Sequence, residues 1–432
     1  MEKKKRRSRQ LAWTKLDNTA NLFPVIASES LTNVYRISAV LTEEIDPELL
    51  NESVEFVAGE FLNFRMRLRK GVFWYYFEEN DHPLPKVTEE NDFPTSYINK
   101  NKNNQYLFRV TYYGRRINLE VFHALSDGYG GLIFLKEIVY QYLRKKYPEA
   151  LSGEKDKISS GVFLDQEDSY VKNFRSDGKQ HKKTYTSRRA VTLKGEYLQR
   201  GEVGVLHCYM PVDQLKKAAK GYSVTINQFL VGAFIYSVYR AYLEGKPSAK
   251  PISCCVPVNL RPYYDSHTLK NFFVMVSAVF KPEKDDYSFE EVLPIVADSL
   301  KEQTTKENLE KILEYNVSNE RNFILRMIPL TIKNIAIRQV YQASAHGTTS
   351  TVTNIGNVDI REPYIPYIKN FSAMLAMSKG QNMKGAISSY QGILTITFTT
   401  VLADPSILKQ FVQCMTDCDI EVAVETNGAY DF

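Results

Sequence analysis

Apolar positions in the first part of the chain follow strand and helix periods in turn. Residues 32–43 (TNVYRISAVLTE) alternate in the manner of a strand, and residues 46–70 carry apolar side chains at helical spacing. Asp46 and Pro47 form a suitable helix start, and the acidic residue after them complements the helix dipole. We therefore expect a strand and then a helix over these two ranges.

The pattern then leads to a histidine at a strand end. Residues 71–80 predict a strand, and residues 106–122 predict a hairpin that turns at Gly114. The second strand of this hairpin runs directly into His123. Residues 132–147 follow, with apolar side chains at helical spacing and a cationic last turn, so they predict a helix.

Residues 151–200 differ from both flanks because they are polar and charged with little periodicity, and we interpret them as a crossover between lobes. Strand-like and helix-like blocks alternate again from residue 201. Residues 223–246 predict a long buried helix that Ser223 or Thr225 caps. The strand-like blocks are residues 204–211, 252–264, 350–358 and 392–402. The pattern is that of an α/β protein.

The length of 432 residues exceeds what one hydrophobic core usually serves, so we expect two lobes. The expected division is a flexible basic tail over residues 1–15, an N-terminal lobe over 16–150, the crossover over 151–200 and a C-terminal lobe over 201–432. Each lobe should combine helices with strands as an α+β two-layer sandwich.

The net charge of +5 is carried entirely by residues 1–10, which hold six basic side chains and Glu2. The remaining residues balance to zero, which argues against nucleic acid as a partner, because such a partner needs an excess of cations. The tail itself is expected to be solvated, with weak contact to an anionic membrane surface as the alternative.

The sequence predicts a cytoplasmic protein without a metal site. The segment after the tail lacks the apolar stretch of a secretion signal, and no run approaches the roughly 18 apolar residues of a membrane span. The cysteines show no metal-binding spacing and no disulfide framework. Cys254 and Cys255 lie in a predicted core strand and are expected to pack as small apolar residues.

The run from His123 to Gly128 (HALSDG) carries the candidate chemistry. A histidine, an aspartate and a glycine at these offsets, between a strand and a glycine-rich turn, resemble the active-site motif of the chloramphenicol-acetyltransferase-like superfamily of acyltransferases and condensation domains. Three further segments agree in order. Residues 223–240 resemble the Thr-x-Asn helix of that superfamily, residues 257–273 its Asn-Leu-Arg strand with a downstream Asn-Phe, and residues 350–358 a strand of the bacterial alcohol-acetyltransferase-like branch.

The resemblance implies two lobes with an active-site tunnel between them and His123 midway along it. His123 is then the general base that takes a proton from an acceptor hydroxyl or amine, which attacks the thioester of acyl-CoA directly, with acetyl-CoA as a candidate donor. Acyl-CoA is a co-substrate, and no cofactor is expected to be bound. The acceptor is expected to be a small or lipid-like molecule. Phe122 replaces the first histidine of the pair found in condensation domains.

Residues around the base have expected roles as well. The resemblance implies that Asp127 forms an ion pair with Arg261 and fixes the loop that carries His123, whereas the alternative is a catalytic dyad with the imidazole. Gly128 is expected to adopt a backbone conformation closed to other residues and to keep the tunnel open. Thr353 and Asn354 are candidates for stabilising the oxyanion, with a purely structural role at a strand end as the alternative.

Two other functions remain open at this point. The first is a catalytically retired acyltransferase fold that serves as a binding module, and the second is an enzyme that uses a carrier-protein thioester in place of CoA. Residues 322–342 form an amphipathic basic segment that we interpret as a core helix kinked near Pro329, with a helix lying on a membrane surface as the alternative.

Overall fold

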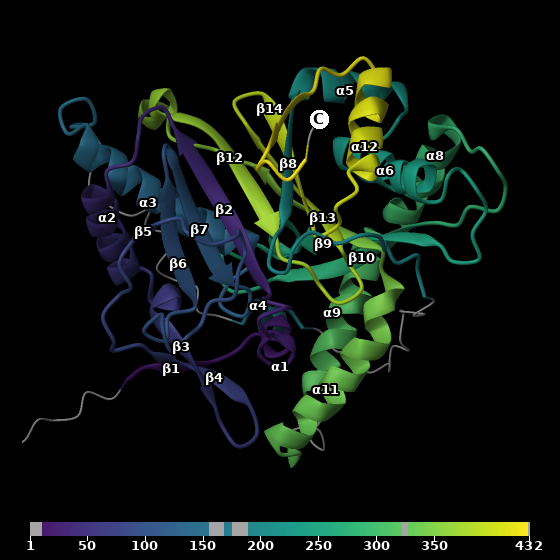
Figure 1. Cartoon of the computed structure of the whole chain (residues 1–432). Coiled ribbons are helices and arrows are strands. Elements are labelled where there is room, and N and C mark those ends of the chain that lie inside the picture. Colours follow the sequence, from purple (N-terminus) through teal and green to yellow (C-terminus); the bar gives the residue numbers. More distant parts are fainter. Residues whose placement is uncertain (1–10, 155–167, 175–188, 322–326, 431–432) are drawn as a thin grey trace, which may run out of the picture.

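The computed structural model describes residues 11–154, 168–174, 189–321 and 327–430. Within these ranges, one sheet of five strands has the order β12-β2-β7-β6-β5. Its strands are β2 (Val34–Leu41), β5 (Thr88–Glu89), β6 (Phe108–Tyr113), β7 (Arg116–Phe122) and β12 (Ile368–Leu375). The helices α2 (Pro47–Glu60) and α3 (Gly128–Lys146) pack together beside it (Figure 1). We call this the N-terminal sheet.

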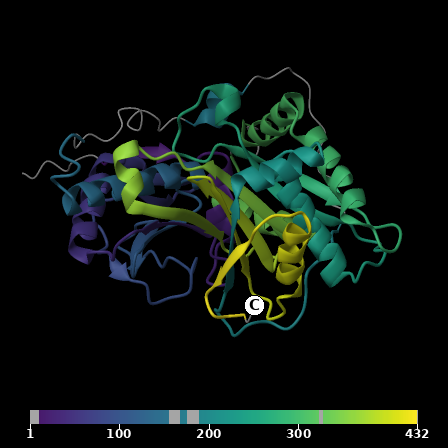
Figure 2. The same cartoon turned by 90° about the horizontal axis from the view of Figure 1, so that it is seen from above.

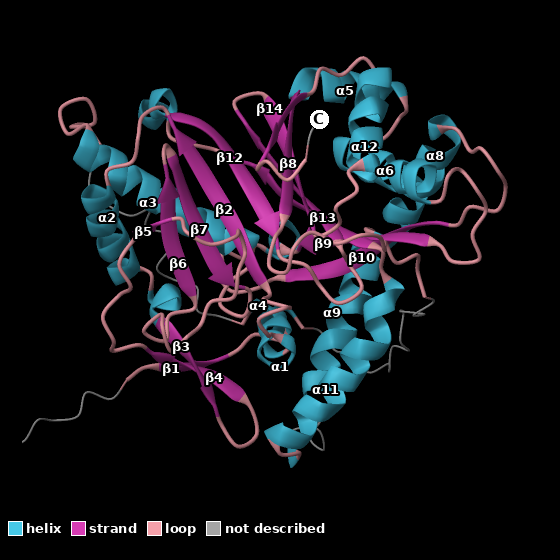
Figure 3. Ribbon diagram, in the orientation of Figure 1, coloured by secondary structure: helices cyan, strands magenta, loops and turns pink. Residues whose placement is uncertain are grey.

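A second sheet of the described residues has seven strands in the order β10-β9-β11-β13-β14-β8-β15. They are β8 (Gly204–Pro211), β9 (Ile252–Asn259), β10 (Phe273–Phe280), β11 (Ser350–Asn357), β13 (Met383–Tyr390), β14 (Ile393–Thr400) and β15 (Ala423–Thr426). The helices α5 (Val212–Gly221), α6 (Ile226–Ser237), α8 (Phe289–Gln303) and α12 (Ser406–Asp417) cover one face (Figure 3). This is the C-terminal sheet, and Figure 2 shows it on the opposite side of the molecule from α2 and α3.

Shorter elements complete the described fold. A small sheet joins β1 (Trp13–Lys15), β4 (Tyr75–Glu79) and β3 (Met66–Lys70). The remaining α-helices are α1 (Phe23–Ile26), α4 (Ser169–Asn173), α7 (Arg261–Tyr264), α9 (Lys306–Arg321) and α11 (Leu330–Ser344). Short 3-10 turns lie at Thr19–Asn21, Leu62–Arg65, Ala345–Gly347 and Glu362–Tyr367, and a π turn lies at Val238–Tyr242. No helix within the described residues is long and apolar enough to cross a membrane.

The predicted mixture of helices and strands in two lobes is confirmed, but several boundaries differ. The helix expected over residues 46–70 ends at Glu60, since Phe61 leaves the helical conformation and the chain turns into β3. The helix expected over residues 223–246 begins after Thr225, which forms a reciprocal capping box with Gln228.

The expected tail and lobe division needs two corrections. Residues 13–15 are not part of a flexible tail, because they form β1, in which Trp13 lies opposite Glu78 of β4. β12 comes from the range assigned to the C-terminal lobe, yet it pairs antiparallel with β2, with Ser372 opposite Ser38. One strand of the later sequence therefore completes the N-terminal sheet and ties the lobes together (Figure 1). Residues 1–10 and much of the crossover lie outside the described residues.

The prediction of a buried, kinked helix over residues 322–342 is wrong for the described part. α11 begins after Pro329 and buries only Leu330, while Ile332, Ile335 and Val340 are 57%, 60% and 65% exposed. The helix is held largely by polar contacts: Lys333 donates to the Phe73 carbonyl, and Arg338 donates to the Val25 carbonyl. Ile332 and Ile335 are therefore largely exposed, whereas Val340 belongs to the lining of the cavity described below. Membrane-surface contact stays a prediction, and residues 322–326 lie outside the described residues.

Alternation along β9 and β10 separates a core face from an open face. Cys254, Val256, Val274 and Val276 belong to the apolar core under α6 and α8. Their odd-numbered neighbours point to the other face, since successive side chains of a strand alternate. This open face of the C-terminal sheet is turned toward the N-terminal sheet, and the candidate site lies there.

Candidate active site

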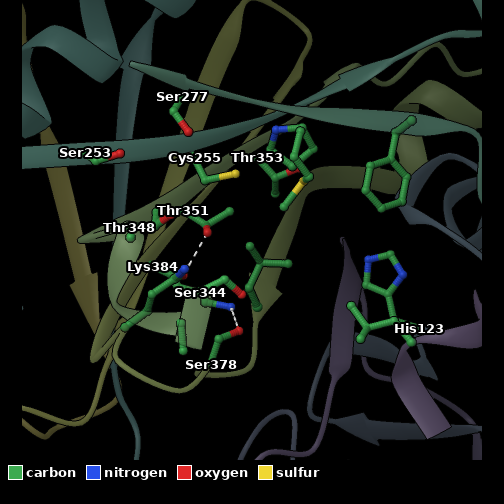
Figure 4. A pocket seen from close by; sticks show the side chains of 18 of the residues that line it. His123, Ser253, Cys255, Ser277, Ser344, Thr348, Thr351, Thr353, Ser378 and Lys384 are labelled. Carbon is green, nitrogen blue, oxygen red and sulfur yellow. Dashed lines mark hydrogen bonds between the residues drawn. The ribbon is translucent and has the colours of Figure 1, made fainter. Parts of the chain in front are cut away.

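A cavity of about 1550 Å³ lies between the two sheets. Its wall from the C-terminal sheet includes small side chains at alternate positions, namely Ser253, Cys255, Ser277, Thr351 and Thr353 (Figure 4). Apolar side chains of the same strands, such as Pro257, Met275 and Val279, line it as well. Cys254 and Cys255 are both buried, as expected, but only Cys254 belongs to the apolar core cluster, whereas Cys255 faces the cavity. The opposite wall includes Tyr35 and His123 from the N-terminal sheet.

His123 follows β7 immediately, as expected, and its position is fixed from three sides. Its backbone N–H donates to the Asn33 carbonyl at 2.9 Å. Its ring stacks on Phe23, with ring centroids 4.6 Å apart, and meets the Tyr35 ring edge-on at 5.1 Å. These aromatic contacts leave the imidazole few other orientations.

A hydrogen-bond chain sets the tautomer of the imidazole. His123 Nδ1 lies 3.0 Å from Asn271 Oδ1, and Asn271 Nδ2 donates to Asp17 Oδ2 at 3.0 Å. The carboxylate thus orients the amide so that its oxygen faces the imidazole, and Nδ1 must carry the hydrogen. His123 Nε2 is then the unprotonated nitrogen, and it forms no hydrogen bond with any residue in the described ranges.

Electrostatics keep this imidazole neutral near pH 7. Burial in the cavity wall lowers the pKa of His123 below its usual value of 6.5, against a smaller raising effect from the charge of Asp127. Burial also raises the pKa of Asp17 to about 7, although the Asn271 amide and the Ala20 backbone N–H both favour its ionised form. A neutral imidazole with a free Nε2 is a competent proton acceptor.

Asp127 has all of its hydrogen bonds away from the imidazole. Arg261 Nη1 donates to Oδ2 at 2.8 Å and Arg261 Nη2 donates to Oδ1 at 3.1 Å. The backbone N–H groups of Gly130 and Phe272 donate to the same carboxylate at 3.1 and 3.0 Å. Asp127 therefore caps α3 and joins the His123 loop to the chain around β10. Both side chains of the pair are buried.

Arg261 is held as firmly as its partner. Its guanidinium also donates to the carbonyls of Thr268 and Lys270, and it lies 4.3 Å from the centre of the Tyr129 ring. Planar bidentate pairing of this kind is specific to arginine. The geometry is that of a structural clamp between the lobes.

No protein-family model matches the sequence, and no curated protein matches it. Solved structures match nearly the whole chain. The trichothecene 15-O-acetyltransferase TRI3 of Fusarium sporotrichioides has a TM-score of 0.60 at 10% identity, covering 96% of this chain and 97% of that one. Polyketide synthase associated protein 5 of Mycobacterium tuberculosis has a TM-score of 0.59 at 13% identity, covering 93% and 97%. The condensation domain of the Monacolin K polyketide synthase MokA has a TM-score of 0.55 at 11% identity, covering 95% and 98%.

The chain has the chloramphenicol-acetyltransferase-like fold. At these identities the likeness establishes the arrangement of the two lobes and not the reaction. The reaction therefore depends on the residues that this chain places in the cavity.

The glycines after Asp127 are required by close packing and not by an unusual backbone conformation. The φ angle of Gly128 is not positive, so its backbone conformation is open to other residues, and that part of the prediction is wrong. A Cβ atom there would lie 3.2 Å from a methyl group of Ile355, across the cavity. The strict requirement is at Gly130, where a Cβ would come within 2.4 Å of the Leu269 carbonyl oxygen.

Thr353 and Asn354 lie on β11 beside the cavity but differ in their contacts. The Thr353 side chain lines the cavity with Thr351, and its hydroxyl forms no hydrogen bond with another described residue. Asn354 Oδ1 accepts from the Gly356 backbone N–H at 2.8 Å, and Asn354 Nδ2 donates to Asn227. The Thr353 hydroxyl is thus uncommitted, whereas both polar atoms of the Asn354 side chain already bond within the protein.

Sequence reasoning missed three residues of this site. Asn271 was within the recognised segment 257–273, but its contact with His123 was not foreseen. Asp17 and Lys384 had no signal of their own. Among the described residues, no group of histidine, cysteine and acidic side chains is arranged to hold a metal ion.

The pH dependence of catalysis follows from the lowered pKa of His123. We expect the acid limb of the kcat/KM profile to fall as the pH drops through the pKa of His123, below 6.5, because protonation removes the acceptor site. A kcat/KM profile from pH 5 to 9 measures this. A midpoint above pH 7 would contradict the assignment of a buried, neutral imidazole.

Asn271→Ala should lower kcat by roughly 10- to 100-fold, because the imidazole loses the partner that fixes its tautomer and orientation. The Asn271 hydrogen bond raises the pKa of His123, so its removal should also move the acid limb of the profile to lower pH. Asn51→Ala is the control away from the cavity, because the Asn51 amide donates to Glu55 and accepts from the Val87 backbone N–H. An unchanged profile with a reduced kcat would contradict the positioning role.

Proposed function

We propose that this protein is an acyltransferase that moves an acyl group from acyl-CoA to a hydroxyl or amine acceptor. The observation that carries the proposal is His123, a neutral imidazole whose Nε2 is free at the wall of a large cavity between two lobes. Nδ1 is committed to Asn271, so Nε2 is the nitrogen available for proton transfer. The acetyltransferase among the structural neighbours agrees with this chemistry.

The proposed reaction requires only the donor, the acceptor and side chains of this protein. Nε2 of His123 takes the proton of the acceptor O–H or N–H as the oxygen or nitrogen attacks the thioester carbon. The tetrahedral intermediate carries its negative charge on the former carbonyl oxygen, toward which the Thr353 hydroxyl can donate. The C–S bond then breaks, and protonated His123 returns the proton to the thiolate. The products are the acylated acceptor and free CoA.

Free CoA is the donor that the cavity charge favours. Arg189 and Lys281 line the cavity with exposed side chains, and CoA carries phosphates that such cations can bind. The alternatives are a carrier-protein thioester, as the condensation domains among the neighbours suggest, and a retired enzyme that only binds ligands.

The test is release of free thiol from acetyl-CoA and longer acyl-CoA donors across a panel of alcohols and amines, with the acylated product identified by mass. We expect acceptor-dependent thiol release that matches product formation. Turnover with an acyl carrier protein and none with CoA donors would replace CoA by the carrier. Binding of acyl-CoA without turnover of any donor would favour the retired enzyme.

A further inference from the structure

Lys384 places a buried ammonium group in the wall of the cavity. The residue is 7% exposed and lies on β13, where it stands opposite Thr351 of β11. Thr351 in turn stands opposite Cys255 of β9. Because residues in register share one face of a sheet, these three side chains form a row across the C-terminal sheet, and all three line the cavity (Figure 4).

The neighbours of Lys384 supply no negative charge. Lys384 Nζ donates to Ser378 Oγ at 2.6 Å, and beside it the Thr351 hydroxyl donates to Gln381 Oε1 at 2.8 Å. Burial raises the pKa of the Cys255 thiol to about 12, so this group is neutral. Within the described parts of the chain, Lys384 forms no ion pair.

The described wall of the cavity carries a net positive charge. Its cations are Arg189, Arg261, Lys281, Lys379 and Lys384, whereas its acidic side chain is Asp127. Asp127 is already engaged by Arg261. A ligand in the cavity therefore meets an excess of positive charge, and at Lys384 it meets that charge out of contact with bulk water.

A buried ammonium group with only neutral partners is unfavourable, because the protein replaces water with too few hydrogen-bond acceptors. Burial accordingly lowers the pKa of Lys384 to about 8, which still leaves most of the side chain charged at pH 7. Such a group is retained at a cost to stability, which is typical of residues that serve a ligand.

We propose that Lys384, with Ser378, binds an anionic group, a carboxylate or a phosphate, of the substrate that occupies the cavity beside His123. The role of Lys384 rests on the proposed acyl transfer, because the bound anion is a substrate only if that reaction takes place. The two residues share one cavity: burial is the main cause of the lowered pKa of His123, and the charge of Lys384 acts in the same direction. The anionic group thus belongs to the acyl group, to the acceptor or to the CoA part of the donor.

Three sources of the anionic group are separable with matched probes. Succinyl-CoA and butyryl-CoA have acyl groups of equal carbon number, and only the first ends in a carboxylate. An ω-hydroxy carboxylate and its primary amide make the same comparison for the acceptor. A CoA thioester and the corresponding pantetheine thioester test the phosphates of CoA.

Binding is measured first, by calorimetry on His123→Ala, so that no turnover is needed. We expect one acidic probe to bind more tightly than its neutral counterpart. Lys384→Met should remove this preference, weakening the acidic probe by about 30-fold or more while the neutral probe is unchanged, because a buried charge pair loses one partner. Lys246→Met, a change at an exposed lysine paired with Glu244, is the control.

Stability separates this role from a structural one. Lys384→Met removes a poorly compensated buried charge, so its Tm should be equal to or above that of the wild type, and Lys384→Gln provides a second neutral variant. The proposal is overturned if no acidic probe is preferred, or if the preference survives both substitutions. Acid preference without any acyl transfer would refute the proposed function and leave the anion site standing. Normal acyl transfer between neutral substrates by both Lys384 variants would support the proposed function and overturn the anion site.

Discussion

His123→Ala is expected to lower kcat by about 10²–10⁴-fold with little change in Tm. The imidazole supplies the proton acceptor for attack and the proton donor for thiolate departure, and no other described side chain in contact with it can replace both roles. Its ring contacts with Phe23 and Tyr35 are partial, since the residue lines a cavity, so the loss of packing should be small. Steady-state thiol release and a thermal melt measure both quantities.

The matched control is His82→Ala, because His82 is an exposed histidine on the N-terminal lobe away from the cavity wall. This variant should retain full turnover. If His123→Ala retained wild-type turnover with a competent donor and acceptor, His123 would not be the base. If it lost activity together with its folded state, His123→Gln would be needed to separate the two effects, and an inactive, folded His123→Gln supports the assignment.

Arg261→Ala is expected to destabilise the protein by about 3–5 kcal/mol, the second largest effect that we predict. The substitution leaves the Asp127 carboxylate buried without its cation, and it also removes the donors to the Thr268 and Lys270 carbonyls. The segment before β10 would lose its connection to the His123 loop, so activity should fall as well. Chemical denaturation gives the change in the free energy of unfolding.

Asp127→Asn distinguishes the clamp from a catalytic dyad. As a clamp member it should lose stability and activity together, because the amide cannot accept all four hydrogen bonds from Arg261, Gly130 and Phe272. Arg240→Ala is a suitable control, since it breaks an exposed ion pair with Asp286 that should be worth little. An Asp127→Asn variant with normal stability and lost activity would favour the dyad.

The sequence predicted the elements around the motif because local patterns determine them. The strand before His123, the helix after Asp127 and the capping residue Thr225 all follow from neighbouring side chains. The pairing of Asp127 with Arg261, which are 134 residues apart, was expected from the family resemblance and not from any local pattern.

The rest of the site depends on contacts that only the fold creates. Asp17 acts on His123 through Asn271, which is 254 residues away from Asp17 in the chain. β12 lies in the C-terminal half of the sequence and pairs with β2, and no hydrophobic periodicity predicts which distant strand it pairs with. Lys384 resembles any strand lysine in the sequence, and its burial becomes visible only when the register of β9, β11 and β13 is known.

Direct transfer within one complex of protein, donor and acceptor is the central claim, and a single-turnover experiment tests it most directly. The protein, in excess, is mixed with acyl-CoA labelled in the acyl group and with the acceptor, then quenched over time. Label and free thiol are quantified, and the intact mass of the chain is measured at each point. We predict that label appears on the acceptor in step with free thiol while the mass of the chain never increases. An acylated chain that forms before the product, or free thiol without labelled acceptor, would contradict the claim.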